Sequence, residues 1–116
     1  MKRDEILNMP AGQEMDALVL ERVLRKAVLR EPGGRPHFLT TPYSSDIGSA
    51  WEVVEKLKTD GKWLSISTHL IGTNNQWCCE YSDNSLQSEV NVTMADTAPL
   101  AICRASLLAI MELEPE

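Results

Sequence analysis

The feature that most constrains this chain is one apolar segment, DTAPLAICRASLLAI, at residues 96–110. It predicts a helix whose side chains are mostly apolar all round, and after Asp96 its only charged residue is Arg104. The segment is shorter than the ~20 residues that a membrane-spanning helix needs, so we expect it inside a folded domain. Helices that are apolar all round are buried on every side, often against a second subunit. We therefore expect a homo-oligomer.

Arg104 is the anomaly within that segment, because a buried unpaired charge is costly and must meet an anion. One reading is a structural ion pair with a carboxylate such as Asp46 or Asp96. The other is a phosphate, or another anionic ligand, held by the guanidinium fork. Thr97 lies seven residues earlier on the same helical face, and helix side chains lean towards the N-terminus. Arg104 and the free amides at the helix start could therefore form a composite phosphate site.

Composition and charge exclude several classes of protein. At 116 residues, with 43% hydrophobic and 24% charged residues, the chain is expected to fold as a single globular domain over residues 1–116. A net charge of -6 and a pI near 4.9 argue against binding to DNA or RNA, which needs a basic face. No secretory signal or membrane span is recognisable, so we expect a cytoplasmic protein. Three cysteines suit reduced thiols, and two distant histidines predict neither a metal nor another cofactor.

Helical periodicity occurs in two further stretches. Residues 3–26 predict a helix with one apolar stripe, interrupted at NMPAGQ by Pro10 and Gly12. A second helix is expected to end near Lys58, before Gly61. Its N-cap candidates are Ser44, Ser45 and Asp46, and its apolar stripe is formed by Ile47, Ala50, Trp51, Val54 and Leu57.

Between and after these helices the pattern changes. Residues 27–41 are rich in Pro and Gly and predict a loop, with a short strand at 28–30 or 37–40. KWLSISTHL, QWCCEY and EVNVTMA then alternate as strands, joined by the turns GTNN and SDNS. Three such strands form an antiparallel meander. The fold expected is therefore α+β: a small antiparallel sheet covered by helices, in a layered α/β/α sandwich.

Two aromatic residues are further candidates for a binding site. Trp77 alternates with Cys79 and Tyr81, so it is either part of the sheet core or a platform on which a base stacks. Tyr43 precedes a helix start, where it could stack on a ligand, whereas Ser45 is most simply a helix cap. Signatures of catalysis such as a Walker loop, GxSxG or HExxH are absent, and nothing local activates a thiolate. We therefore expect no enzyme.

Three passages together resemble a known family. MKRDEILNMPAGQEMDALVLERV, PYSSDIGSAWEVVEKL and DTAPLAICRASLLAI are similar, in order and spacing, to phage and prophage proteins with the phage ABA sandwich domain. The best-understood members are phage Thoeris anti-defence proteins of the first type. They are sponges that bind the cyclic ADP-ribose signal of a bacterial TIR protein without cleaving it. Some are hexamers, built as trimers of dimers, and also bind cyclic di- or trinucleotides from CBASS defence.

The resemblance implies a sponge that sequesters cyclic nucleotide signals, such as glycocyclic ADP-ribose, in the cytoplasm of the infected host. It implies that Arg104 anchors phosphate at a dimer interface and that Trp77 stacks on adenine. The other ligand residues that it implies are Asp96, Thr97, Tyr43 and Ser45. Two rivals remain open: a phage accessory protein that acts by protein contact, with Arg104 in an ion pair, and a phosphodiesterase-like enzyme that destroys the signal. The missing histidine pair disfavours the second.

Overall fold

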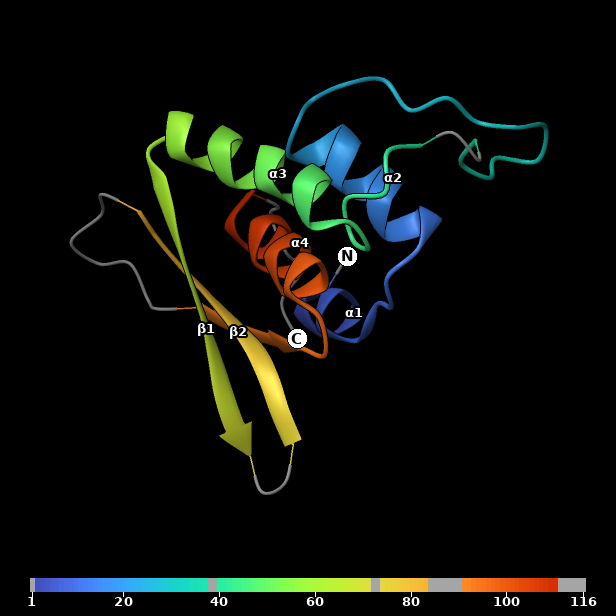
Figure 1. The fold of residues 1–116 in the computed structure, drawn as a ribbon. Helices are drawn as coiled ribbons and strands as arrows, with labels where there is room; N and C mark the ends of the chain where they lie inside the picture. The colour runs from blue at the N-terminus through green and yellow to red at the C-terminus, as the bar shows by residue number, and fades with distance from the viewer. Residues whose placement is uncertain (1, 38–39, 72–73, 84–90, 111–116) are drawn as a thin grey trace.

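A computed structural model describes residues 2–37, 40–71, 74–83 and 91–110 of the chain. These residues form an α+β domain, as the sequence predicts (Figure 1). In chain order the elements are α1 (Arg3–Asn8), α2 (Gln13–Arg22), α3 (Ile47–Thr59), β1 (Lys62–Ile71), β2 (Asn74–Asp83), β3 (Asn91–Ala95) and α4 (Ala98–Ile110).

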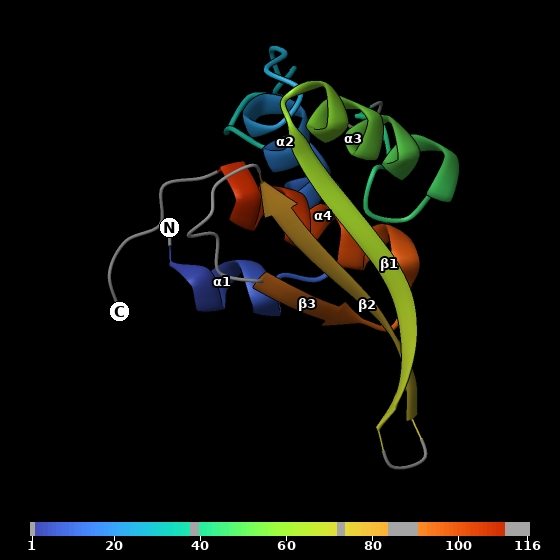
Figure 2. The ribbon, with the colours of Figure 1, turned by 90° about the vertical axis from the view of Figure 1, so that its left-hand side faces the viewer.

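The sheet is the predicted antiparallel meander, with strand order β1-β2-β3. Its register places Ile66 opposite Cys79 and Cys79 opposite Thr93, so these three side chains share one face of the sheet. That face is the one packed against the hydrophobic core. One end of the β1–β2 hairpin projects beyond the helices, where Leu70 is exposed (Figures 1 and 2).

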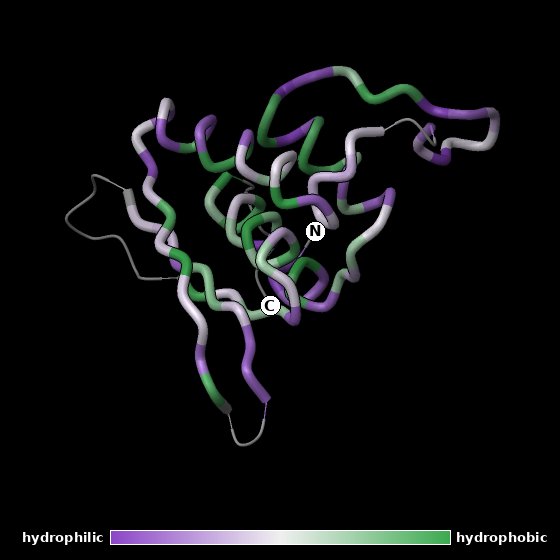
Figure 3. Tube along the Cα trace, viewed as in Figure 1, coloured by the Kyte–Doolittle hydropathy of each residue, from purple (hydrophilic) through white to green (hydrophobic). Residues whose placement is uncertain are grey.

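The helices are arranged around α4. Both α3 and α4 contact the sheet, while α1 and α2 pack against α4 (Figure 2). Hydrophilic residues mark the outer turns of α3 and the end of β2 that lies far from the helices (Figure 3). The buried residues of α4 are Pro99, Ala101, Ile102, Cys103, Ala105, Ser106, Leu107 and Leu108. Much of the apolar surface of α4 is thus buried inside one chain, while Leu100 and Ile110 are only partly buried.

The helix boundaries follow from local chemistry. The predicted break between α1 and α2 is present, with Gly12 at a φ of 152° immediately before α2. Asp46 is the N-cap of α3, because its Oδ2 accepts hydrogen bonds from the backbone N and the Oγ of Ser49, both at 2.8 Å. At the other end Gly61 has a φ of 82°, which a glycine adopts without strain.

Two expectations about side chains and one about a strand need correction. Ile47 and Trp51, placed by periodicity in the core stripe of α3, are 52% and 50% exposed, and Val53 is buried instead. The helix is rotated so that the line Ala50, Val53, Leu57 faces the core. In the loop, the extra strand reduces to one bridge between Arg30 and Pro36, and residues 38–39 lie outside the described part.

Candidate functional site

An apolar groove of about 540 Å³ lies where α3 and α4 begin, over the core-facing side of the sheet. It brings together three of the predicted site residues, Trp77, Asp96 and Thr97. The described residues that line it are Ile47, Trp51, Ile66, Trp77, Asp96, Thr97, Ala98 and Pro99. Four separate elements and the link between β3 and α4 therefore contribute to one surface.

The groove exists because α4 covers only part of the sheet, and its first residues lie at the border of the uncovered part. Two hydrogen bonds fix the helix along the strands: the Tyr81 hydroxyl donates to the carbonyl of Leu108 at 3.2 Å, and Thr93 Oγ1 donates to that of Ala101 at 2.9 Å. Trp77 lies on the same face as Tyr81, at the level of the helix start. Its indole is therefore 37% exposed although it belongs to the core face of the sheet.

The second indole of the groove belongs to Trp51, which sequence reasoning assigned to the core. Trp51 and Ile47 are one helical turn apart on α3, and both line the groove. Helical periodicity alone does not separate an apolar side chain that faces the core from one that faces a groove at its edge. No signal in the sequence distinguishes Trp51 from Val53 in this respect.

The polar part of the lining lies at the start of α4. The carbonyl of Thr97 accepts the backbone N–H of Ala101 at 3.2 Å, which makes Thr97 the N-cap of this helix. Helix N-termini favour negative charge, because their first amides point outward and carry the positive end of the dipole. Among the described residues of the lining, the one charged side chain is the carboxylate of Asp96.

Arg104 contacts two backbone carbonyls in the structure. Its Nη1 donates to the carbonyl of Met94 and its Nη2 to that of Met9, both at 2.9 Å. Within the described residues it makes no ion pair with Asp46 or Asp96, its Nε has no hydrogen-bond partner, and it does not line the groove. Burial lowers the pKa of Arg104 below its usual value, and the negative charge of Asp96 opposes that shift. The guanidinium does reach back along the helix, but to carbonyl oxygens.

The remaining predicted ligand residues lie apart from the groove. Tyr43 is 2% exposed and part of the core, where desolvation raises the pKa of its hydroxyl, so its ring is not open to a ligand in this arrangement. Ser45 is exposed but does not line the groove. The structure therefore does not bring these two residues together with Trp77, Asp96 and Thr97.

A buried carboxylate that sequence reasoning missed explains the position of Tyr43. Asp16 is 4% exposed, and its Oδ1 accepts hydrogen bonds from the backbone N and the Oγ of Ser44 at 2.7 and 2.6 Å. Ser44, a predicted cap, is thus a buried partner of α2 instead. Desolvation raises the pKa of Asp16, although the hydrogen bonds from Ser44 oppose the rise.

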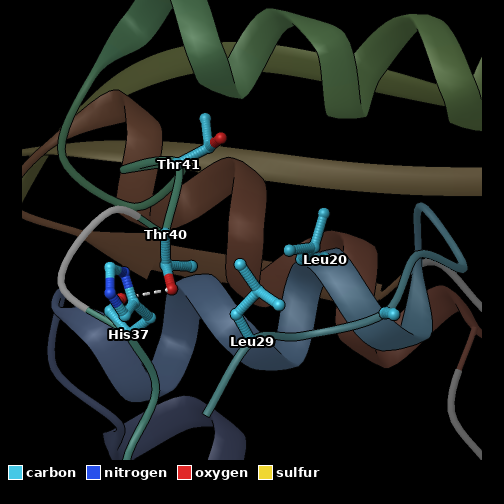
Figure 4. A pocket seen from close by; sticks show the side chains of 6 residues that line it. Leu20, Leu29, His37, Thr40 and Thr41 are labelled. Carbon is cyan, nitrogen blue, oxygen red and sulfur yellow. Dashed lines mark hydrogen bonds between the residues drawn. The ribbon is translucent and has the colours of Figure 1, made fainter. Parts of the chain in front are cut away.

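Two other hollows contain none of the predicted site residues. Figure 4 shows the smaller one, of about 140 Å³, where Thr40 Oγ1 donates to the carbonyl of His37 at 2.6 Å. Its lining is Leu20, Ala27, Leu29, His37, Thr40 and Thr41. The other, of about 580 Å³, lies between α1 and α2 and is lined by residues 9–14 and Arg35.

The three thiols are inaccessible to solvent. Cys78, Cys79 and Cys103 are all buried, and desolvation raises the pKa of Cys79 to about 12 and that of Cys103 further still. Over the described ranges, no three His, Cys, Asp or Glu side chains cluster as a metal site would require. In the same ranges, no helix has the length and apolar character needed to cross a membrane.

The comparisons with known proteins identify the family. The model of the phage ABA sandwich domain matches residues 19–107. The chain belongs to the phage ABA sandwich domain family. This ABA sandwich domain also has the fold of a crystal structure of a phage protein from Bacillus cereus ATCC 14579. The two share 24% sequence identity and a TM-score of 0.64 over 89% of this chain and 95% of that one. No curated protein matches the chain.

Proposed function

We propose that this ABA sandwich domain is a phage anti-defence sponge that binds cyclic nucleotide immune signals and holds them uncleaved in the cytoplasm of the host. The observation that carries the proposal is the groove with two exposed indoles, Trp51 and Trp77, at the start of α4. Aromatic side chains bind bases by stacking, at ~1–3 kcal/mol for each base. Family membership and the resemblance to Thoeris anti-defence proteins add support.

The phosphates of such a ligand need donors, and within one chain these are the first amides of α4. Both outer nitrogens of Arg104 already donate hydrogen bonds, to the carbonyls of Met9 and Met94. We therefore assign Arg104 the role of holding the start of α4 in place rather than that of a direct phosphate anchor. Glycocyclic ADP-ribose and the cyclic di- and trinucleotides of CBASS are the candidate ligands. A homo-oligomer, a dimer or a hexamer, would contribute further donors from a second copy.

Capture without turnover makes modest demands on a site. It needs stacking surfaces, a few anion-directed donors and enclosure, but neither a general base nor a metal. The groove lining offers the first two. Among its described residues Asp96 is the one carboxylate, and no titratable neighbour in that set could share acid and base roles with it. These features favour binding over hydrolysis.

The test is calorimetric titration with glycocyclic ADP-ribose and a panel of cyclic di- and trinucleotides, followed by heat release and chromatography of the ligand. We expect tight binding and recovery of the intact ligand. A hydrolysed product would instead establish the phosphodiesterase-like enzyme, and no heat with any ligand would favour the protein-contact reading.

Tryptophan variants connect that binding to the groove. Trp77→Ala and Trp51→Ala should each raise Kd by about 5- to 150-fold, the equivalent of one lost stacking contact. The matched control is Trp63→Ala, because Trp63 is also 50% exposed but lies outside the groove, on the other face of the sheet. Equal losses in all three variants would contradict binding in the groove.

A further inference from the structure

The carboxylate of Asp96 is exposed at the edge of the groove and has no assigned partner. In the described part of the lining it is the one charged group, beside two indoles and mostly apolar side chains. Among the described residues, no hydrogen bond or ion pair uses its oxygens. Both oxygens therefore remain able to accept hydrogen bonds from a molecule that enters the groove.

Asp96 neither caps α4 nor forms an ion pair with Arg104, so these two structural roles leave its oxygens unoccupied. The N-cap of α4 is Thr97, whose carbonyl accepts the N–H of Ala101, so Asp96 lies one position before the cap. Arg104 donates to two backbone carbonyls and is affected by Asp96 only through its charge. The fold thus leaves an unpaired acceptor at the edge of an aromatic groove.

An ionised carboxylate accepts hydrogen bonds and donates none. A ring stacked on Trp51 or Trp77 is therefore favoured when its edge carries an N–H donor, and disfavoured when that edge carries a carbonyl oxygen. Adenine, cytosine and guanine carry an exocyclic amino group. Uracil and thymine carry a carbonyl oxygen at the ring position where cytosine has its amino group. The groove can thus distinguish bases by one chemical group.

We infer that Asp96 makes the groove selective for a base with an exocyclic amino group, which it recognises by accepting a hydrogen bond from that group. The inference rests on the proposed function and narrows its ligands to those that contain adenine, cytosine or guanine. It also orients the ligand, because the base edge that carries the amino group faces Asp96.

Adenosine and purine riboside test this inference, because they differ only in the amino group and carry no phosphate. Binding is followed by NMR of the indole N–H signals of Trp51 and Trp77. We expect adenosine to bind about tenfold more tightly than purine riboside. Asp96→Ala should bring the two affinities to nearly the same value. Glu80→Ala removes an equal charge from an exposed position on the opposite face of the sheet, and should preserve the preference.

The outcomes separate this inference from the proposed function. Equal affinity for the two nucleosides, or a preference that survives Asp96→Ala, overturns the role of Asp96 and leaves the sponge intact. An absence of adenosine binding at millimolar concentration overturns it as well. If adenosine is preferred but every cyclic nucleotide fails in calorimetry, the selectivity of the groove stands and the sponge does not. N6,N6-dimethyladenosine, which lacks the amino donor, should bind the unmodified protein no better than purine riboside.

Discussion

Asp16 has a buried carboxylate, and burial disfavours its ionised form. Its carboxylate is almost inaccessible to solvent and accepts two short hydrogen bonds from Ser44, which holds the segment before α3 against α2. Desolvation raises the pKa of Asp16 above the ordinary 3.8, so the folded state binds this proton more tightly than the unfolded chain does. Ionisation of Asp16 therefore lowers the free energy of unfolding.

This sign predicts how stability depends on pH. Relative to Asp16→Asn, the unmodified protein should lose stability as the pH rises from about 3.8 through the raised pKa of the folded state, and the difference should then stay constant. Thermal unfolding of both proteins across this range measures the effect. Ser44→Ala removes the hydrogen bond that the hydroxyl donates to Asp16, which favours the ionised form, and should extend the window to higher pH. A difference that does not change with pH would contradict the raised pKa.

At the scale of elements, Arg104 joins three segments that are distant in sequence. Its two hydrogen bonds connect α4 to Met94 on β3 and to Met9 in the link between α1 and α2. Hydrogen bonds to charged groups contribute more than neutral ones, and their removal leaves carbonyls without a donor. Arg104 is thus the residue that holds the edge strand and the α1–α2 link against α4.

Arg104→Ala should lower the free energy of unfolding by about 2–4 kcal/mol, measured by urea denaturation. Arg104→Lys keeps the charge but has a single nitrogen, so it should recover only part of the loss. Arg22→Ala is the control, because Arg22 is exposed on α2 and its removal should change stability by less than about 0.5 kcal/mol. Unchanged stability of Arg104→Ala together with lost ligand binding would instead establish Arg104 as the phosphate anchor.

Periodicity in the sequence predicted the helices and strands well, but it predicted less well which of their side chains are buried. The cap at Asp46, the break near Pro10 and the three strands depend on local chemistry, which the sequence contains in full. The exposure of Trp51 depends on where α4 begins relative to the sheet, which is a tertiary property. The same holds for the groove. The sequence indicated Trp77, Asp96 and Thr97 as separate candidates. No residue spacing in the sequence predicts that Trp51 lies beside them or that Arg104 lies outside the groove.

At the scale of the whole molecule, one chain already buries its most apolar helix. The sheet packs against α4 on one side and the other helices pack against it elsewhere, so one chain buries most of this helix. The homo-oligomer that we propose needs surfaces that one chain leaves open. The apolar groove and the exposed hairpin end with Leu70 are described surfaces that remain open for this.

The three thiols report how cooperatively this core opens. Cys78 and Cys79 lie on opposite faces of β2, and Cys103 lies on α4, yet all three are buried and a pKa of about 12 keeps Cys79 protonated near neutral pH. A thiol reagent at pH 8 should therefore leave the native protein unlabelled and modify all three cysteines after unfolding. Because sheet and α4 share one core, the three should be labelled at the same rate, and this rate should rise with urea at the slope of global unfolding. Rapid labelling of Cys78 alone would show that β2 opens locally from its outer face while its contacts with α4 persist.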